Sequence, residues 1–300
     1  MAAPEGAFRP EPARYGEVYD RGYKHYEGER LGRRQAFRAL IRYSIQRSLG
    51  IKKRWTAKIV PIILYTVAAG TVLILIGIES FLPDAETMTY ANFFGFIFVI
   101  QGMFVATIAP EMLCPDRREN VLSLYFSRAI TRLDYVLAKL AAAAILTLTI
   151  SFVPAALLWL FRQLLADSPL PALRDNVGDL GWIALVGTLI AFYLGAIGLV
   201  ISSFTGRKSI AVPVIIVGYL VTEGLVNTVA FAVEDEAISD WLLFLSPATL
   251  TQNLAFSIFP TEEDLAALNI AFEWWAYAAA MLATIVLSCA IMVWRYVPED

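Results

Sequence analysis

The chain has 300 residues, of which 58% are hydrophobic and 17% charged, and its mean hydropathy is +0.61. Charged residues make up about a quarter of an ordinary soluble domain, so this composition indicates a membrane protein. A net charge of -3 and a pI near 5.4 do not support nucleic-acid binding. The two cysteines, Cys114 and Cys289, exclude a disulfide framework, and the single histidine, His25, excludes a zinc metalloprotease of the HExxH kind.

The N-terminal segment divides into two parts. Residues 1–32 carry prolines and glycines among mixed charges, which predicts a flexible cytosolic tail. Residues 33–55 are predicted to form an amphipathic helix. Its exposed face carries Arg38 and Arg42, and its apolar positions at helical spacing are Phe37, Leu40, Ile41 and Ile45. Such a helix lies on an anionic membrane surface or docks on a soluble partner, and the pattern fits both alternatives.

Residues 56–297 contain six apolar segments that reach or approach the roughly 20 residues needed to cross about 30 Å of hydrocarbon. They lie at residues 59–78, 91–110, 141–161, 181–204, 210–233 and 274–294. The prediction is an all-α polytopic membrane protein in which residues 56–297 form a transmembrane domain of six helices.

The distribution of basic residues predicts the orientation. If the N-terminus is cytosolic, 22 of the 24 Lys and Arg residues lie on the inner side, and only Arg162 and Arg174 lie outside. This matches the positive-inside bias of membrane proteins. The outer loops hold 14 of the 27 acidic residues, which is consistent with the same orientation. We therefore expect a multi-pass protein of the plasma or inner membrane with both termini in the cytosol.

The last outer loop, residues 234–273, contains an apolar stretch that Ser246 and Pro247 interrupt. The stretch is too short on either side of this break to cross a bilayer. It predicts two short helices that enter the outer interface, or alternatively an extracellular helical hairpin packed on the ends of the spans.

The inner loop after the second span predicts a short amphipathic helix from Arg117 to Ser127. Asp116 with Glu119 three residues later has the pattern of an N-terminal cap. Thr131 with Asp134 forms a second capping box, which begins the helix that continues through Lys139 into the third span. The short helix binds another protein or rests on lipid headgroups, and its sequence leaves both open.

This loop resembles the signature of type-2 ABC exporter permeases, in which an acid ends the second span before a charged pair, a Leu-rich short helix and a basic turn. Ala129 replaces the usual Pro of that turn, Asn120 stands where Gly is common, and Cys114 and Pro115 are inserted upstream. The six spans, the N-terminal helix and the long outer loop extend the resemblance over residues 33–295. The matching positions are Arg118, Glu119, Leu122, Leu124, Ser127, Arg128, Ile130, Thr131, Arg132 and Lys139.

The resemblance implies a non-enzymatic permease subunit that dimerises with a second copy or a homologous permease. Separate ABC ATPase subunits would use ATP and Mg and would dock on the short helix. This chain would bind no cofactor. Its Gly206 to Ser209 segment does not bind ATP as a P-loop does, because it lacks the upstream glycine and the strand of that motif. Arg207 and Lys208 in that turn are interpreted as orientation signals and lipid headgroup contacts. The implied ATPase contacts are Arg117, Arg118, Glu119, Leu122, Tyr125 and Arg128.

One acid lies deep in a predicted span. Glu223 falls about 13 residues into the fifth span, near 20 Å from its cytosolic end at 1.5 Å per residue. A charge there costs roughly 2.5 to 3.5 kcal/mol, so the group should be protonated, paired or facing water. With Tyr219 and Asn227 on the same face, it is a candidate for lining a translocation path. The alternative is a protonated Glu hydrogen-bonded to a neighbouring span, for example at Gln101.

The fourth span carries Gly187, Ala191 and Gly195 at intervals of four residues, which predicts close helix packing.

Two other functional classes compete with the permease. A proton-coupled secondary transporter using Glu223 would be expected to show matching Gly/Pro-broken spans in its two halves, and the sequence has none. A membrane enzyme such as a lipid transferase would need a paired-Asp metal motif or a nucleophile with its base in the inner loops, and we find neither. The sequence leaves the transported substrate open among drugs, lipids and peptides.

Overall fold

The computed structural model describes residues 32–51, 53–81, 88–126, 130–260 and 271–296, which contain helices and no strand. The described residues belong to a single compact unit that begins at Gly32. The predicted flexible tail lies outside the described residues apart from Gly32.

Within these described ranges, six helices are long and apolar enough to cross a membrane, and each coincides with a predicted span. The predicted all-α fold with six spans is therefore confirmed. A 3-10 helix, η1 (Trp55–Lys58), leads directly into the first span. The spanning helices are α2 (Ile59–Phe81), α3 (Tyr90–Arg118), α5 (Arg132–Leu165), α7 (Val177–Ser203), α8 (Lys208–Ala232) and α12 (Trp274–Arg295).

The predicted pair of short helices in the last outer loop is present as α9 (Glu236–Leu243) and α10 (Pro247–Ile258). The break lies where the sequence indicated it, because the Ser246 side chain accepts a hydrogen bond from the Thr249 backbone N–H at 3.2 Å and Pro247 occupies the first turn. Their depth in a membrane stays a prediction. A further short helix, α6 (Pro169–Asp175), was not predicted.

The N-terminal helix α1 (Gly32–Ser48) is shorter than the predicted 33–55. Gly50 ends it with a positive φ of 68°. The N–H groups of Gly50 and Ile51 bond back to the carbonyls of Arg47 and Gln46 at 3.2 and 3.0 Å, which is a Schellman motif. A side chain at position 50 would also meet the Ala57 carbonyl oxygen at 3.1 Å.

The apolar face of α1 packs against protein. Leu40 is buried, Phe37, Ile41 and Ile45 pack on the hydrophobic core, and α1 contacts α5 and α3. Arg38 and Arg42 are exposed on the other side. The spanning helices therefore already cover the face that a membrane surface or a soluble partner was expected to cover.

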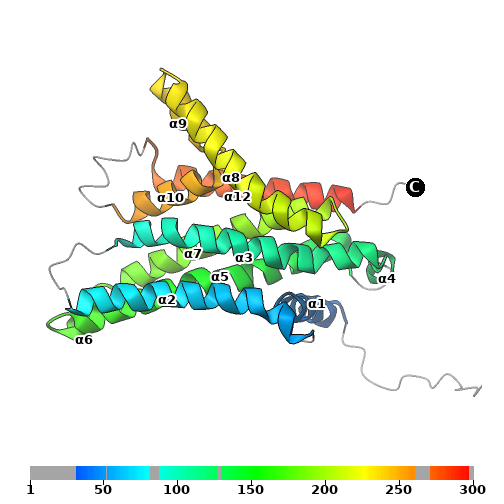
Figure 1. Cartoon of the computed structure of the whole chain (residues 1–300), viewed down its shortest axis with the longest axis horizontal. Helices are drawn as coiled ribbons and strands as arrows, with labels where there is room; N and C mark the ends of the chain where they lie inside the picture. Colours follow the sequence, from blue (N-terminus) through cyan, green and yellow to red (C-terminus); the bar gives the residue numbers. More distant parts are fainter. Residues whose placement is uncertain (1–31, 52, 82–87, 127–129, 261–270, 297–300) are drawn as a thin grey trace, which may run out of the picture. The chain divides into compact units, whose positions relative to one another are not determined.

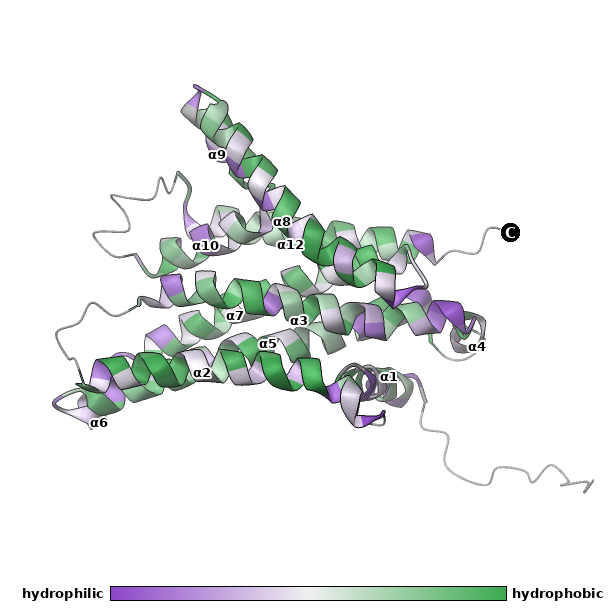
Figure 2. Cartoon of the chain, in the orientation of Figure 1, coloured by the Kyte–Doolittle hydropathy of each residue, from purple (hydrophilic) through white to green (hydrophobic). Residues whose placement is uncertain are grey.

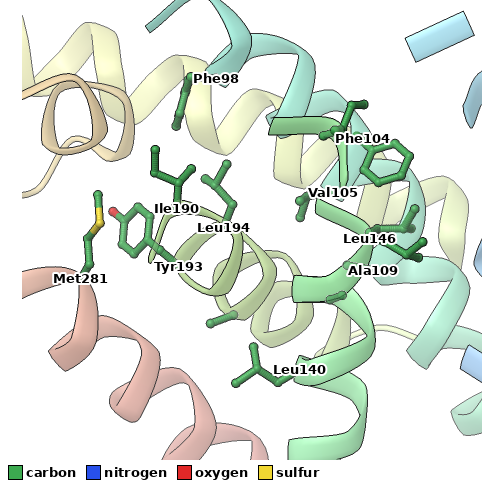
Figure 3. Close-up of a cluster of buried hydrophobic side chains, with 14 of the residues drawn as sticks. Phe98, Phe104, Val105, Ala109, Leu140, Leu146, Ile190, Tyr193, Leu194 and Met281 are labelled. Atoms are coloured by element: carbon green, nitrogen blue, oxygen red, sulfur yellow. The ribbon is translucent and has the colours of Figure 1, made fainter. Parts of the chain in front are cut away.

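The central helix of the bundle is α7, which packs against α3, α5 and α12 (Figure 1). Figure 3 shows the resulting cluster, in which Ile190, Tyr193 and Leu194 of α7 meet side chains of the neighbouring helices. The most apolar 18-residue window of α3 is 72% buried, whereas those of α2 and α8 are only 17% buried. Much of the apolar surface of α2 and α8 is therefore left for lipid or a partner chain.

Hydrophilic residues gather at the end of the bundle where α3 ends beside α4 (Leu122–Phe126), while the middle of the spans is apolar (Figure 2). We call this end of the bundle, where α1 and α4 lie, the α4 end.

Candidate functional site

A buried ion pair lies at the α4 end. The Nζ atom of Lys139 lies 2.7 Å from Oδ2 of Asp116 and 2.9 Å from the Met112 carbonyl oxygen, and neither charged side chain is exposed. Tyr135 also donates a hydrogen bond to Oδ2 of Asp116 at 3.0 Å. Because a buried charge without its partner costs several kcal/mol, these contacts hold the end of α3 against the first turns of α5.

The prediction that Asp116 caps a new helix at Arg117 is wrong. The second span continues as α3 through Pro110 and Pro115 to Arg118, so Asp116 lies in its last turn. The Asp116 carboxylate is engaged by Lys139 and Tyr135, and the short helix α4 begins only at Leu122.

A Schellman motif separates α3 from α4. The N–H of Val121 bonds to the Asp116 carbonyl at 3.2 Å, and the N–H of Asn120 bonds to the Arg117 carbonyl at 3.3 Å. This motif needs a left-handed residue, and Asn120 has a φ of 52°. Asn adopts this conformation more readily than most other non-glycine residues, so Asn120 can fill a position that favours glycine.

Aromatic rings hold α4 against the start of α5. The rings of Tyr125 and Phe126 each lie 5.9 Å from the ring of Tyr135, which is buried and also meets the ring of Tyr296 at 5.5 Å. Burial raises the pKa of Tyr125 to about 12, so its hydroxyl is neutral at physiological pH. A continuous series of contacts therefore runs from α4 through Tyr135 to Asp116 and Lys139.

The helix α1 is tied to the same cluster by two arginines. Arg33 donates two hydrogen bonds of 2.8 Å to the Asp134 carboxylate, and Arg47 lies 3.4 Å from Asp116 and 3.8 Å from Glu119. Asp134 also completes the capping box with Thr131, which confirms the predicted start of this helix.

Glu111 and Arg117 join α7, α8 and the segment before η1 to the cluster. Glu111 forms ion pairs with Lys53, before η1, and with Lys208, the first residue of α8. The guanidinium of Arg117 donates to the carbonyl oxygen of Ser203 at the end of α7. Together these groups form what we call the α4-end network: Arg33, Arg47, Lys53, Glu111, Asp116, Arg117, Glu119, Asp134, Tyr135, Lys139 and Lys208.

A second polar cluster surrounds Glu223 on α8. The Asn227 side-chain amide donates to Oε1 of Glu223 at 2.9 Å, the Thr249 hydroxyl donates to the same atom at 3.2 Å, and the Ser246 hydroxyl donates to Oε2. Glu223 thus binds the first turn of α10. The suggestion that Glu223 is hydrogen-bonded to Gln101 is wrong. The Gln101 amide is buried with no hydrogen-bond partner among the described residues.

Tyr219 lies one turn from Glu223 on α8. Its ring centroid is 6.1 Å from that of Phe98, and its buried hydroxyl has no hydrogen-bond partner among the described residues. Tyr219 and Glu223 both line a cavity of about 160 Å³ between α3 and α8. Asn227 is exposed, and its described polar partners are Glu223 and Thr249.

The small residues of α7 lie against two different helices. A side chain on Gly195 would meet Ala143 of α5 at 3.4 Å, and one on Gly187 would meet Leu148 of α5 at 3.6 Å, while Ala191 is buried. The α7 glycine with the closest helix contact, Gly198, was not predicted. A Cβ atom on Gly198 would lie 2.3 Å from Cγ1 of Val105 on α3.

A family model described as ABC-2 family transporter protein matches residues 18–300. The chain belongs to this family. No curated protein matches it. The family and the six apolar helices make this ABC-2 chain a multi-pass membrane subunit of a transporter.

The implied ATPase contacts of this ABC-2 chain fall into three groups. Arg118 and Glu119 have side chains that are 68% and 48% exposed. Leu122 and Tyr125 are half-buried and pack on the core, and Arg117 is held by Ser203. Arg128 lies outside the described residues.

The sequence reasoning missed one ion pair near the other end of the bundle. Nε and Nη2 of Arg162 donate to Oε1 of Glu79 at 2.9 and 2.6 Å, and Nη2 also donates to the Met88 carbonyl at 2.6 Å. The signal was available, because Arg162 is one of only two basic residues on the predicted outer side. In the part of the chain that the structure describes, no group of three or more His, Cys, Asp or Glu side chains is arranged to hold a metal ion.

Proposed function

We propose that this chain is the membrane subunit of an ATP-driven exporter. In this proposal two copies, or one copy and a homologous permease, enclose the translocation path. Separate ABC ATPase subunits dock on α4 and supply the energy by hydrolysing ATP, with Mg as their cofactor.

The observation that carries the proposal is the route from α4 to the spans. Tyr125 and Phe126 press on Tyr135, and Tyr135 in turn contacts Asp116, the partner of Lys139. A displacement of α4 would therefore act on α3 and α5 together. Because interiors are close-packed, such a push is transmitted rather than absorbed.

Exposed side chains beside and within α4 can form contacts with an ATPase subunit. Arg118 and Ser123 are both exposed, and Arg118 lies 3.2 Å from Glu119 in a weak surface ion pair that a partner can exchange. These side chains are the proposed docking contacts, whereas Tyr125 and Phe126 are proposed to pass the motion inward.

The proposed path runs along the face of α8 that carries Tyr219, Glu223 and Asn227. The low burial of α8 within one chain supports a second permease beside it. Glu223 would then face the path with its carboxylate held by Asn227, Ser246 and Thr249. The competing secondary transporter would use the same acid, but it would need no ATPase.

The proposal places the α4 end in the cytosol. Reporter fusions after Arg174 and within residues 234–273 are then external, and a fusion at Gly206 is cytosolic. An internal signal from the long acidic loop would overturn this orientation.

The docking test coexpresses the full chain with an ABC ATPase subunit. Arg118→Glu with Ser123→Glu should reduce copurification of the ATPase about tenfold, because a reversed charge and a new negative charge at the contact together cost about 1.4 kcal/mol or more. The matched control is Arg174→Glu, an exposed arginine on α6. Undiminished copurification of the ATPase with the double variant would refute docking on α4.

A further inference from the structure

An apolar groove lies where α7 turns into α8, apart from both clusters described above. Its volume is about 440 Å³. Thr205 is its polar lining residue, and six apolar side chains make up the rest: Val200, Ile201, Phe204, Ile210, Ala211 and Val214.

The groove is open to the surroundings of the chain. Phe204, Ile210 and Val214 remain 56%, 48% and 49% exposed. In a protein with six membrane spans such a surface faces acyl chains or another apolar partner.

Two arginines lie near the lining residues of the groove, one beside the Phe204 ring and one two positions after Thr205. Arg295 of α12 has its guanidinium carbon 5.9 Å from the centre of the Phe204 ring, and Arg207 is the residue before α8. Neither forms an ion pair among the described residues, whereas the neighbouring Lys208 is paired with Glu111. Two cations with no ion-pair partner in the described part of the chain, next to an apolar groove, complement a molecule with an anionic head and an apolar tail.

We propose that this groove binds an anionic phospholipid. An acyl chain lies along Ile201, Ile210 and Val214, and the headgroup phosphate bonds to the guanidinium groups of Arg207 and Arg295. Basic pockets between spans bind lipid headgroups by this chemistry. The adjacent N-terminus of α8, a helix of 25 residues, adds a favourable field for the phosphate.

The charges favour lipid over a second copy of the chain. A symmetric dimer through this groove would bring the same patch of both copies together, and with it Arg207 and Arg295 from each side. Like charges facing one another at an interface are unfavourable. An anionic headgroup neutralises the same two cations.

The site also lies next to the α4-end network. Lys208 follows Arg207 and reaches Glu111, and Ser203, just before Phe204, accepts the hydrogen bond from Arg117. A bound lipid would therefore brace the turn between α7 and α8 at the point where α3 is attached to it.

Native mass spectrometry of the purified full chain in detergent tests this proposal. The probes are phosphatidylglycerol and phosphatidylcholine with identical acyl chains, and glycerol 3-phosphate as the free headgroup. We expect phosphatidylglycerol to bind at least tenfold more tightly than phosphatidylcholine, and glycerol 3-phosphate to bind too weakly to compete. Equal binding of the two lipids, or full competition by glycerol 3-phosphate, would overturn the site.

Two variants distinguish the headgroup contact from the acyl-chain contact. Arg207→Gln with Arg295→Gln should weaken phosphatidylglycerol binding about 30-fold, given about a factor of five per removed cation. Arg174→Gln, the matched change on α6, should leave it unchanged. Val214→Trp should also weaken binding, because the indole fills the groove while both arginines remain.

Each variant must keep the thermal unfolding midpoint of the parent chain. Wild-type lipid binding in either groove variant would refute the proposal. If Val214→Trp instead converts dimers to monomers without affecting lipid binding, the groove is an interface between copies and the lipid site is wrong.

Discussion

Lys139 pairs with Asp116, which lies 23 residues earlier in the chain, and the two side chains meet at 2.7 Å with no exposure of either. The pair joins the end of α3 to the first turns of α5, so one buried contact holds together the two ends of the segment that contains α4.

Removing one partner of this pair should be more damaging than removing both. Lys139→Met leaves Asp116 with only Tyr135 and Arg47, and should lower the free energy of unfolding by about 3 kcal/mol or more. Lys139→Met with Asp116→Leu should recover at least half of that loss, because no buried charge remains unpaired. Thermal unfolding in detergent measures both, with the exposed Arg118→Gln as the control.

If the single and double variants are equally destabilised, the pair contributes as packing volume and not as charge. That result would contradict the electrostatic account of the α4 end.

The turn between α3 and α4 should tolerate glycine but not a β-branched residue. Asn120 has a φ of 52°, so Asn120→Gly should be neutral within about 0.5 kcal/mol, whereas Asn120→Val should cost about 1 to 2 kcal/mol. Unfolding midpoints of the two variants provide the comparison. Equal midpoints would mean that position 120 does not need the left-handed conformation.

Close packing of α7 on α3 makes Gly198 sensitive to a single methyl group. Gly198→Ala should destabilise the chain by about 1 to 3 kcal/mol, because the new Cβ would lie 2.3 Å from Cγ1 of Val105. Gly218→Ala on α8 is the control, since nothing lies within 4 Å of its Cβ position. Val105→Ala combined with Gly198→Ala should restore part of the stability, and a failure to do so would place the strain elsewhere.

The hydropathy of the sequence predicted all six spans, since each needs about 20 apolar residues whatever its neighbours are. The ends of the spans were harder to predict. The second span was predicted to end at residue 110, yet α3 continues through Pro110 and Pro115 to Arg118, where Lys139 and Tyr135 hold its last turn.

Contacts between distant residues also escaped prediction. Periodicity shows which residues share one helix face, but the partner of Asp116 or of Arg162 is set by how helices pack against each other. Local signals did better, because the capping box of Thr131 and the break at Ser246 depend only on residues within three positions.

Glu223 should act as an anchor for α10. Glu223→Ala removes the acceptor for the Ser246 and Thr249 hydroxyls, and the loss should cost about 1 to 2 kcal/mol and speed hydrogen exchange of the α10 amides. Glu223→Gln should behave more like the parent chain, since its amide oxygen still accepts. Thr228→Ala, whose exposed hydroxyl bonds only within α8, is the control. Unchanged exchange in Glu223→Ala would contradict the anchor.

The central claim is that α4 transmits motion from an ATPase subunit to the spans. Electron paramagnetic resonance distances test it most directly, with a spin label at Leu220→Cys on the exposed face of α8 in each of two copies, and with Cys114 and Cys289 replaced by alanine. We predict that ATP shifts this distance in the complex with its ATPase. We also predict that Tyr125→Ala with Phe126→Ala, which keeps the exposed docking groups but removes both ring contacts with Tyr135, abolishes the shift while the ATPase still copurifies. An unchanged ATP-dependent shift in the complex that carries both alanine substitutions would contradict the account.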